Sequence, residues 1–385
     1  KMNVKQLTEE RTKLYEDVYD MRKPKRVPVS AGIDIAAALE YCGFSLLTEQ
    51  FDPKYYLLAM DKIAADFNSD NIPAGASRFP SVYKFLGAKN FVMGSDGFVQ
   101  HPNVVGLNVE EYDSFISDPY KVMWDTIIPR LCPEIAKPAP YGTFALTKAF
   151  YSFFKTMSTI IENNSHIVET YGKAPFTTVA SLTEAPYDFL ADQVRSFTGI
   201  SKDIKRIPDK VLAALDSLLP IMVKAGIPQT PANKLSRIFI PLHMAPYMNK
   251  KDFERFYWPT FKKLVCTLDE MGYGIDLFIE HDWSRFVDYL AELPKGCFMM
   301  FEYGDPKFFK EKLGDRAILS GFYPLNLLKT GTKQECLDKA SELLDILAPG
   351  GNYIFNLDKS LLRLNDVNVD NYKALLNYVA ENGKY

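Results

Sequence analysis

The stretch "DLFIEHDWSRF", residues 276–286, places two acids around a histidine directly after an apolar run. Residues two apart on a strand point to the same face, so Glu280 and Asp282 are predicted to share one face and His281 to point to the other. Two carboxylates on one face could bind a metal ion, exchange protons with a substrate, or hold a cationic group. Asp282 could instead cap the helix that follows, because Asp is favoured at helix starts. For His281 a structural role is favoured.

Two further polar side chains end apolar runs in the same way. Glu302 ends "CFMMFE", where an unpaired carboxylate would be costly to bury, so it is predicted to have a function. Asp305 precedes Pro306 and is predicted to cap the next helix. His243 in "IPLHM" could be a core histidine, a metal ligand or a catalytic group. His243, Glu280 and Glu302 together form a candidate ligand set for Zn²⁺, which accepts mixed nitrogen and oxygen ligands.

Strands and helices are predicted to alternate through the second half of the chain, as in βα units with a parallel sheet. The strands are nearly continuous apolar runs, which is typical of a sheet covered on both faces. The predicted strands are residues 237–244, 274–280, 297–302, 317–322 and 352–357. The predicted helices are residues 250–272, 284–293, 306–314, 333–347 and 369–382.

The first half of the chain is less regular. Residues 1–25 are predicted to form a helical extension, and residues 80–170 to form loops and short helices that decorate the fold. The predicted elements between and after them are strands at 26–32 and 175–182 and a helix at 55–67. The whole chain, residues 1–385, is predicted to be one domain.

Polar side chains gather at the carboxyl ends of the predicted strands, which is where a (β/α)8 TIM barrel carries its chemistry. No G-x-G-x-x-G follows an early strand, so a barrel with N-terminal helical elaborations is favoured over a dinucleotide-binding open sheet. Trp283, Tyr303 and Tyr323 could line a pocket for a flat substrate, or could pack on the rim. The polar residues at the strand ends are His243, Glu280, Glu302, Ser320, Asn356 and Asp358.

The composition excludes several classes of protein. Lys and Arg number 45 against 48 Asp and Glu, and the net charge of −3 argues against a nucleic-acid-binding protein. No apolar run reaches the ~18 residues of a membrane span, and the start of the chain lacks a signal-peptide pattern. The five cysteines are scattered and without a CxxC pair, which favours reduced thiols in a cytoplasmic protein.

Several longer stretches, in their order and spacing, cover nearly the whole chain. They are "RVPVSAG" (26–32), "EYDSFISDPYKVM" (111–123), residues 185–216, "FYWPTFKKLV" (256–265), residues 319–335 and "GGNYIF" (350–355). Together they resemble the uroporphyrinogen decarboxylase superfamily, which includes the decarboxylase and the barrel methyltransferases that work with corrinoid proteins. The resemblance implies a single barrel domain.

Two departures from that superfamily narrow the activity. The decarboxylase holds the acidic side chains of its tetrapyrrole with an arginine-rich R-Q-A-G-R motif, whereas the sequence after "RVPV" reads "SAGIDIAAAL". The thiol methyltransferases bind zinc through His-x-Cys and a distant Cys, whereas this chain has Glu280-His281-Asp282 and "NLDKS" (356–360). Both activities are therefore disfavoured.

The residues at the strand ends match a third branch, whose members carry "PLH", Glu-x-Asp and Glu-x-x-Asp patterns. Such proteins resemble the methyltransferase components of corrinoid-dependent O-demethylase systems. The resemblance implies transfer of a methyl group from a small donor, such as a methoxylated aromatic compound, to the cob(I)alamin of a separate corrinoid protein, since no D-x-H-x-x-G motif is present. Acids would protonate the departing oxygen, or a metal such as zinc would coordinate it. The implied catalytic residues are His243, Glu280, Asp282 and Glu302.

Two alternatives remain open. The chain could be a carboxy-lyase acting on a tetrapyrrole or another carboxylate, with Asp34 near the first strand in the substrate site. It could also be a non-catalytic protein that binds a corrinoid or a tetrapyrrole. The sequence leaves the oligomeric state open, with a homodimer as one option.

Overall fold

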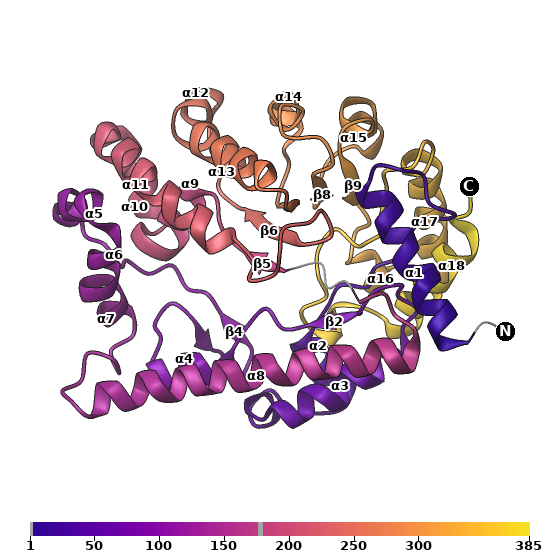
Figure 1. Ribbon diagram of the computed structural model, residues 1–385, viewed down its shortest axis with the longest axis horizontal. Coiled ribbons are helices and arrows are strands. Elements are labelled where there is room, and N and C mark those ends of the chain that lie inside the picture. Colours follow the sequence, from indigo (N-terminus) through magenta and orange to yellow (C-terminus); the bar gives the residue numbers. More distant parts are fainter. Residues whose placement is uncertain (1–2, 176–179) are drawn as a thin grey trace.

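A parallel five-stranded sheet forms the centre of the fold (Figure 1). The computed structural model describes residues 3–175 and 180–385. Neighbouring strands are in register, so that Leu242 lies opposite Ile279 and Ile279 opposite Phe301. In sheet order the strands are β5 (Ser181–Leu182), β6 (Arg237–Leu242), β7 (Gly274–Ile279), β8 (Phe298–Phe301) and β9 (Ile318–Gly321). Residues 176–179 of the predicted strand 175–182 lie outside the described residues.

Parallel pairing continues beyond the sheet through shorter contacts. One edge continues from β9 to residues 353–357 and then to the first extended segment, through the pairs Leu319–Tyr353, Tyr323–Leu357, Val29–Phe355 and Ile33–Leu361. That segment leads to the pair of β1 (Ile33–Asp34) and β2 (Ala74–Gly75), and to the contact of Asn71 with Ala174. The structure therefore confirms an α/β fold with a parallel sheet. A complete eight-stranded barrel stays a prediction, because the continuous sheet formed by the described residues has five strands.

Helices follow the strands of the second half as the alternating pattern predicts, and Figure 1 shows α12 to α15 in a row along one side of the sheet. Residues 284–293 differ from the prediction, because a 3₁₀ turn at Ser284–Phe286 precedes a short α14. The helices are α9 (Pro186–Phe189), α10 (Phe197–Arg206), α11 (Pro208–Gly226), α12 (Lys250–Asp252), α13 (Trp258–Glu270), α14 (Val287–Leu290), α15 (Pro306–Leu313), α16 (Leu327–Thr330), α17 (Lys333–Leu347) and α18 (Val369–Asn382).

The first half contains α1, in the predicted N-terminal extension, and several short elements. Its helices and remaining strands are α1 (Val4–Tyr19), α2 (Ile35–Tyr41), α3 (Pro53–Asp66), α4 (Pro80–Leu86), α5 (Tyr112–Ser117), α6 (Pro119–Val122), α7 (Ile128–Leu131), β3 (Val92–Met93) and β4 (Val99–Gln100). Tyr15 and Tyr19 of α1 pack in a second small core with Phe298 and Ile318 of the sheet. This helix therefore covers one end of the sheet.

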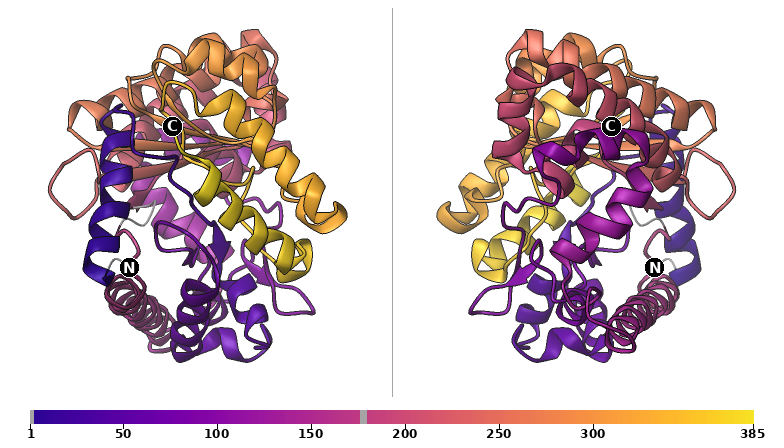
Figure 2. Two further views of the ribbon diagram at one scale, coloured as in Figure 1. Left: turned by 90° about the vertical axis from the view of Figure 1, so that its right-hand side faces the viewer. Right: turned by 90° about the vertical axis from the view of Figure 1, so that its left-hand side faces the viewer.

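The prediction of loops and short helices for residues 80–170 is wrong at its end, where α8 (Tyr141–Tyr171) is a 31-residue helix. Its buried face carries small residues at helical spacing, among them Gly142, Ala145 and Ala149, and packs on α3, α4 and α1. Aromatic side chains also occupy its other face, so the sequence shows no clear amphipathic period. Figures 1 and 2 show α8 along one edge of the molecule.

The structure bears on two predictions drawn from the composition, those on membrane spans and on cysteines. Among the described residues, no helix has the length and apolar character needed to cross a bilayer. All five cysteines are free thiols.

Candidate functional site

The carboxyl ends of β6, β7 and β8 place His243, Glu280 and Glu302 at the same level of the sheet, because the strands are in register. The Nδ1 atom of His243 lies 2.7 Å from the Oε2 atom of Glu280, so these two side chains form a hydrogen-bonded pair. The His243 side chain is 29% exposed and that of Glu280 is 23% exposed. A ligand approaching the strand ends can therefore reach both.

Three more acids reach the same place from the segment after β5. Glu184, Asp188 and Asp192 are four residues apart in "EAPYDFLAD", the spacing of one helix face, and they lie before, in and after α9. Asp192, in a π-helical turn, brings its Oδ2 atom to 3.7 Å from Nε2 of His243. The sequence analysis missed these three residues, although their spacing after a strand could have indicated them. We call Glu184, Asp188, Asp192, His243 and Glu280 the acidic cluster.

Asp188 fixes the backbone beneath His243. Its carboxylate is buried and accepts hydrogen bonds from the backbone N–H groups of His243 at 3.3 Å and Met244 at 2.8 Å. It also accepts one from the hydroxyl of Tyr257 at 2.6 Å. Burial raises the pKa of Asp188 to about 7, against the opposing effects of the positive charge on His243 and of the Tyr257 bond. Asp188 therefore positions the histidine.

His243 is a cation at neutral pH. Burial alone would lower its pKa, but the hydrogen bond to Glu280 and the charges of Asp188, Glu280 and Asp192 raise the pKa to about 10. The imidazolium therefore donates from Nδ1 to Glu280 and carries a second N–H at Nε2.

Glu184, in the same cluster, is uncharged at neutral pH, unlike His243. Burial, and next the charge of Asp192, raise the pKa of Glu184 to about 8. Its Oε2 atom is buried and has no hydrogen-bond partner among the described residues, and Oε1 receives only a 3.4 Å bond from the amide of Gln193. Glu184 is therefore a neutral carboxylic acid at pH 7. The cluster thus combines a cationic histidine with a neutral, partly buried acid.

His101, just after β4, is a second histidine within electrostatic range of the cluster. Partial burial lowers its pKa, and the positive charge of His243 acts in the same direction, whereas Asp192 raises it. Its ring stacks on Phe91 with the ring centres 4.6 Å apart. The pKa values of the two histidines are therefore shifted in opposite directions, downward for His101 and upward for His243.

Glu302 is close to the cluster but has its own partners. It accepts a hydrogen bond from the backbone N–H of His281 at 2.9 Å and one from the ammonium of Lys359 at 3.1 Å. His281 has a positive φ of 57°, so the bond from Glu302 holds an unusual turn. The structure therefore gives Glu302 a partner and a positioning role.

Asp305 takes the predicted capping role, whereas Asp282 orders a turn just before the 3₁₀ helix that begins at Ser284. Asp282 accepts hydrogen bonds from the backbone and side chain of Ser284, and Asp305 accepts one from the backbone of Lys307 at the start of α15. Both carboxylates are therefore engaged in ordering the chain after β7 and β8.

A shallow surface depression includes Asp282 in its lining. His281 exchanges a 2.9 Å hydrogen bond with the hydroxyl of Tyr247, and Tyr303 lies parallel to the His281 ring at 6.5 Å. These three side chains line the depression together with Pro246, Asp282, Ser284 and Arg285. Of the three aromatic residues predicted to contact a substrate, Tyr303 is the one on an open surface.

Trp283 and Tyr323 pack in the core and do not line a pocket. Trp283 is fully buried against Phe253 and Phe286, and its indole N–H donates to the carbonyl of Glu280 at 3.1 Å. Tyr323 is also fully buried and donates to the carbonyl of Cys336 at 3.0 Å. The prediction that these two side chains line a substrate pocket is therefore corrected.

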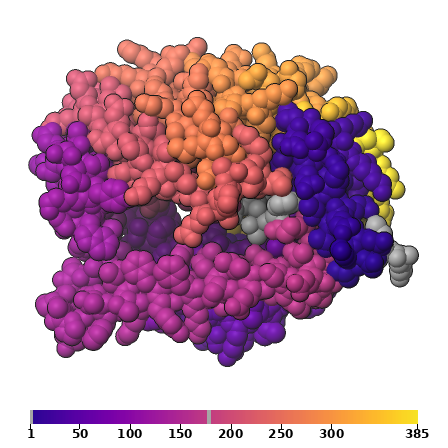
Figure 3. Space-filling model, in the orientation of Figure 1, coloured from indigo at the N-terminus to yellow at the C-terminus, as the bar shows by residue number. Residues whose placement is uncertain are grey.

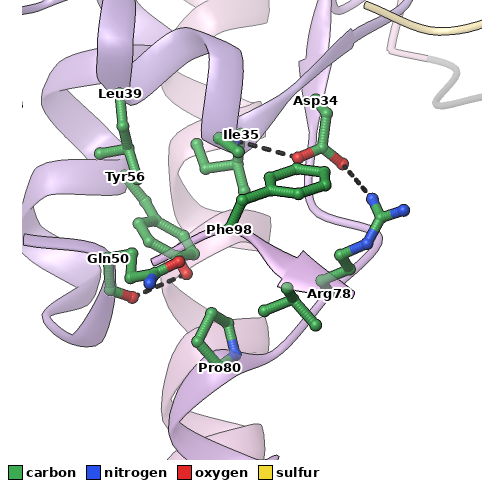
Figure 4. A pocket seen from close by; sticks show the side chains of 10 residues that line it. Asp34, Ile35, Leu39, Gln50, Tyr56, Arg78, Pro80 and Phe98 are labelled. Atoms are coloured by element: carbon green, nitrogen blue, oxygen red, sulfur yellow. Dashed lines mark hydrogen bonds and ion pairs between the residues drawn. The ribbon is translucent and has the colours of Figure 1, made fainter. Parts of the chain in front are cut away.

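Asp34 lies at the end of β1 (Figure 4). It caps α2 through the backbone N–H of Ala36 at 3.0 Å, accepts a hydrogen bond from Ser77 at 2.5 Å and lies 3.7 Å from Arg78. Burial raises its pKa. The cavity beside it is small and lined by side chains such as Ile35, Leu39, Gln50, Tyr56 and Phe98. The carboxylate of Asp34 thus caps α2 and pairs with Arg78.

The predicted zinc ligands are not assembled as a set. Within residues 3–175 and 180–385, no three His, Cys, Asp or Glu side chains are arranged to hold a metal ion. Glu280 is bound by the imidazolium of His243, and Glu302 is bound by the ammonium of Lys359, which competes with a metal cation for the same oxygens. The residues present do not fit zinc in this arrangement.

Comparisons with known proteins show a shared fold. No model of a known protein family matches the chain, and no curated protein sequence matches it. A solved structure described as a methyltransferase from Methanosarcina mazei superposes with a TM-score of 0.63 at 17% sequence identity. The match covers 97% of this chain and 98% of that chain. The two proteins therefore share their fold from end to end.

Proposed function

We propose that the chain is a methyltransferase that removes a methyl group from a small methyl ether, such as a methoxylated aromatic compound, and delivers it to a separate corrinoid protein. The observation that carries this proposal is the cationic His243 within the acidic cluster, at the accessible ends of the strands. The end-to-end fold similarity to a methyltransferase supports the same class of reaction.

The chemical problem in such a reaction is the departing oxygen. When the methyl–oxygen bond breaks, its electron pair stays on the oxygen, and an unprotonated phenoxide or alkoxide is a poor leaving group. A proton delivered to that oxygen removes the difficulty. The cob(I)alamin of the partner protein would supply the nucleophile for the methyl group.

His243 is suited to deliver that proton. Its Nε2 side faces Asp192, and its pKa of about 10 is close to the ordinary pKa of a phenol, about 10. A well-matched acid transfers its proton without a large energetic penalty in either direction. Glu280 and Asp188 keep the imidazole charged and oriented. No metal is required for this step.

The direct test mixes the purified chain, a reduced corrinoid protein and a series of methyl ethers, and follows the loss of the cob(I)alamin absorbance. We expect turnover with at least one donor. His243→Asn removes the proton donor and should lower the rate about 10²-fold, on the scale of lost general acid catalysis. The exposed Glu292→Gln is the control and should retain the wild-type rate.

The pH dependence tests the assignment of the proton donor. The protonated form of His243 is the active one, so the rate should fall as the pH rises above about 10. Because the hydrogen bond and charge of Glu280 help raise this pKa, Glu280→Gln should move the fall to lower pH. An unshifted profile would remove His243 from the role of acid. Release of CO₂ from a tetrapyrrole carboxylate, with no methyl transfer from any donor, would favour the carboxy-lyase alternative.

A further inference from the structure

The outer face of α8 exposes large apolar side chains. Phe144, Tyr151, Phe154 and Ile161 are 55%, 69%, 63% and 60% exposed, on the side of the helix opposite its small buried residues. Folded monomers rarely leave a contiguous patch of this kind open to water, because covering it is favourable. The patch therefore indicates a surface that another molecule covers.

The spacing of this patch is that of a helix–helix seam. Phe144 and Tyr151 are seven residues apart, and so are Phe154 and Ile161, with alternating steps of three and four residues between successive positions. These are a and d positions of two helices that pack side by side, with large apolar side chains at four of the seven positions and Thr or Ser at the other three. The seam consists of Phe144, Thr147, Tyr151, Phe154, Ser158, Ile161 and Ser165, all of them exposed.

A line of charges runs beside the seam with the same seven-residue spacing. It consists of Lys148 and Lys155 in the first half of α8, and Glu162 and Glu169 in the second half. All four side chains are exposed, and none forms an ion pair with another of the described residues. Positions that flank a seam in this way set the orientation and choice of the partner helix.

The charge line is complementary to a reversed copy of itself. A two-fold axis through the middle of the helix, between Ser158 and Thr159, would place Lys155 opposite the partner's Glu162 and Lys148 opposite the partner's Glu169. A parallel arrangement would instead place these charges beside uncharged side chains of the partner helix, such as Phe150 and Met157 of the partner subunit, and would form no ion pair along the line. The pattern thus favours one occupant, a second copy of this chain, in one orientation.

We propose that two copies of this chain form a dimer through α8, with the two helices antiparallel across a two-fold axis. In such an isologous contact each copy uses the same surface patch. Figure 3 shows α8 in the open along the lower edge of the molecule, where a second helix can reach it.

The test is a charge exchange between two variants. The wild-type chain should sediment as a dimer. Two double variants reverse half of the charge line: Lys148→Glu with Lys155→Glu, and Glu162→Lys with Glu169→Lys. The dissociation constant of each variant's dimer should be at least 10-fold higher than that of the wild type, because four charges of one sign then face the same four charges on the partner. An equimolar mixture of the two variants should form a heterodimer, because an all-acidic line then faces an all-basic one.

The control variant is Lys251→Glu with Lys263→Glu, which reverses two exposed lysines on α12 and α13 and should remain a dimer. Circular dichroism checks that each variant is folded, and recovery in the mixture shows it independently. A monomeric wild-type chain, dimers that persist in both double variants, or folded variants that fail to associate on mixing would each overturn the proposal.

Discussion

At the scale of single residues, packing decides which groups of the acidic cluster hold protons. Glu280 is hydrogen-bonded to an imidazolium, whereas the Oε2 atom of Glu184 is buried and finds no hydrogen-bond partner in the described part of the chain. Burial raises the pKa of Glu184 to about 8, so this acid keeps its proton at pH 7 close to the cationic His243. Neighbouring titratable groups with pKa values moved in this way are typical of sites that move protons.

The neutral state of Glu184 predicts how stability depends on pH. The pKa of this group is about 8 in the folded chain and lies near 4.5 when unfolded, so the folded chain binds the extra proton between these values. Its contribution to the free energy of unfolding is fully present below pH 4.5 and is lost as the pH rises towards 8, at about 1.4 kcal/mol per pH unit for an isolated group.

Glu184→Gln removes that ionisation and should flatten the decline. Urea unfolding of wild type and variant at several pH values between 5 and 8 measures the difference. As the pH rises, the free energy of unfolding of the wild type should fall more steeply than that of the variant. An equal pH dependence of the two free energies would contradict the prediction.

Part of the site could be predicted from the sequence. His243 and Glu280 were found because each ends an apolar strand, where a polar side chain stands out. Asp188 and Glu184 were missed because they follow a two-residue strand and enter a helix, where acids are usually solvated. For Trp283 the sequence leaves open a substrate pocket or packing, because an aromatic side chain after a strand serves either, and the structure shows its indole buried in the core.

At the scale of elements, an ion pair inside the sheet joins β6, β7 and α1. The Nε atom of Arg237 lies 2.6 Å from Oδ1 of Asp276, and its guanidinium lies 4.3 Å from the centre of the Tyr19 ring. Both charged side chains are buried. A Cβ atom at Gly274 would lie 2.1 Å from Nη1 of Arg237, so the glycine that starts β7 leaves room for the pair.

Removing one partner of this pair should cost stability. Asp276→Ala leaves a buried guanidinium without its counter-charge, and we expect the free energy of unfolding to fall by about 3–5 kcal/mol. Asp269→Ala, which removes the partly exposed partner of Lys234, is the matched control and should cost about 1 kcal/mol or less. Chemical denaturation of both variants measures the difference, and equal losses would refute the special role of the buried pair.

At the scale of the whole molecule, pairing between the two ends of the chain links the sheet to its N-terminal segments. Ser30 donates its backbone N–H to Phe355 at 2.9 Å, and Leu361 donates to Gly32 at 2.8 Å. The sequence predicts the parallel α/β fold because apolar strand segments and amphipathic helices alternate regularly after residue 236. It could not show the full arrangement of the first half, whose strands are short and whose longest helix has aromatic residues on both sides.

These contacts predict that the two end segments are protected together. Backbone amides in residues 29–34 and 353–361 should exchange hydrogen for deuterium at similar slow rates, because either segment loses its hydrogen bonds only when both separate. Hydrogen exchange followed by mass spectrometry measures this. Fast exchange in residues 29–34, beside slow exchange in 353–361, would show that the segments open independently.

The contact of Val29 with Phe355 also has a consequence for biosynthesis. A ribosome releases the first extended segment long before the segment that becomes its neighbour exists. Until residues 353–361 have been made, one row of backbone hydrogen-bonding groups in the nascent chain lacks its final partner, and such an open edge attracts other strands. Newly made chains are therefore most vulnerable to strand-to-strand aggregation in the interval between synthesis of these two segments.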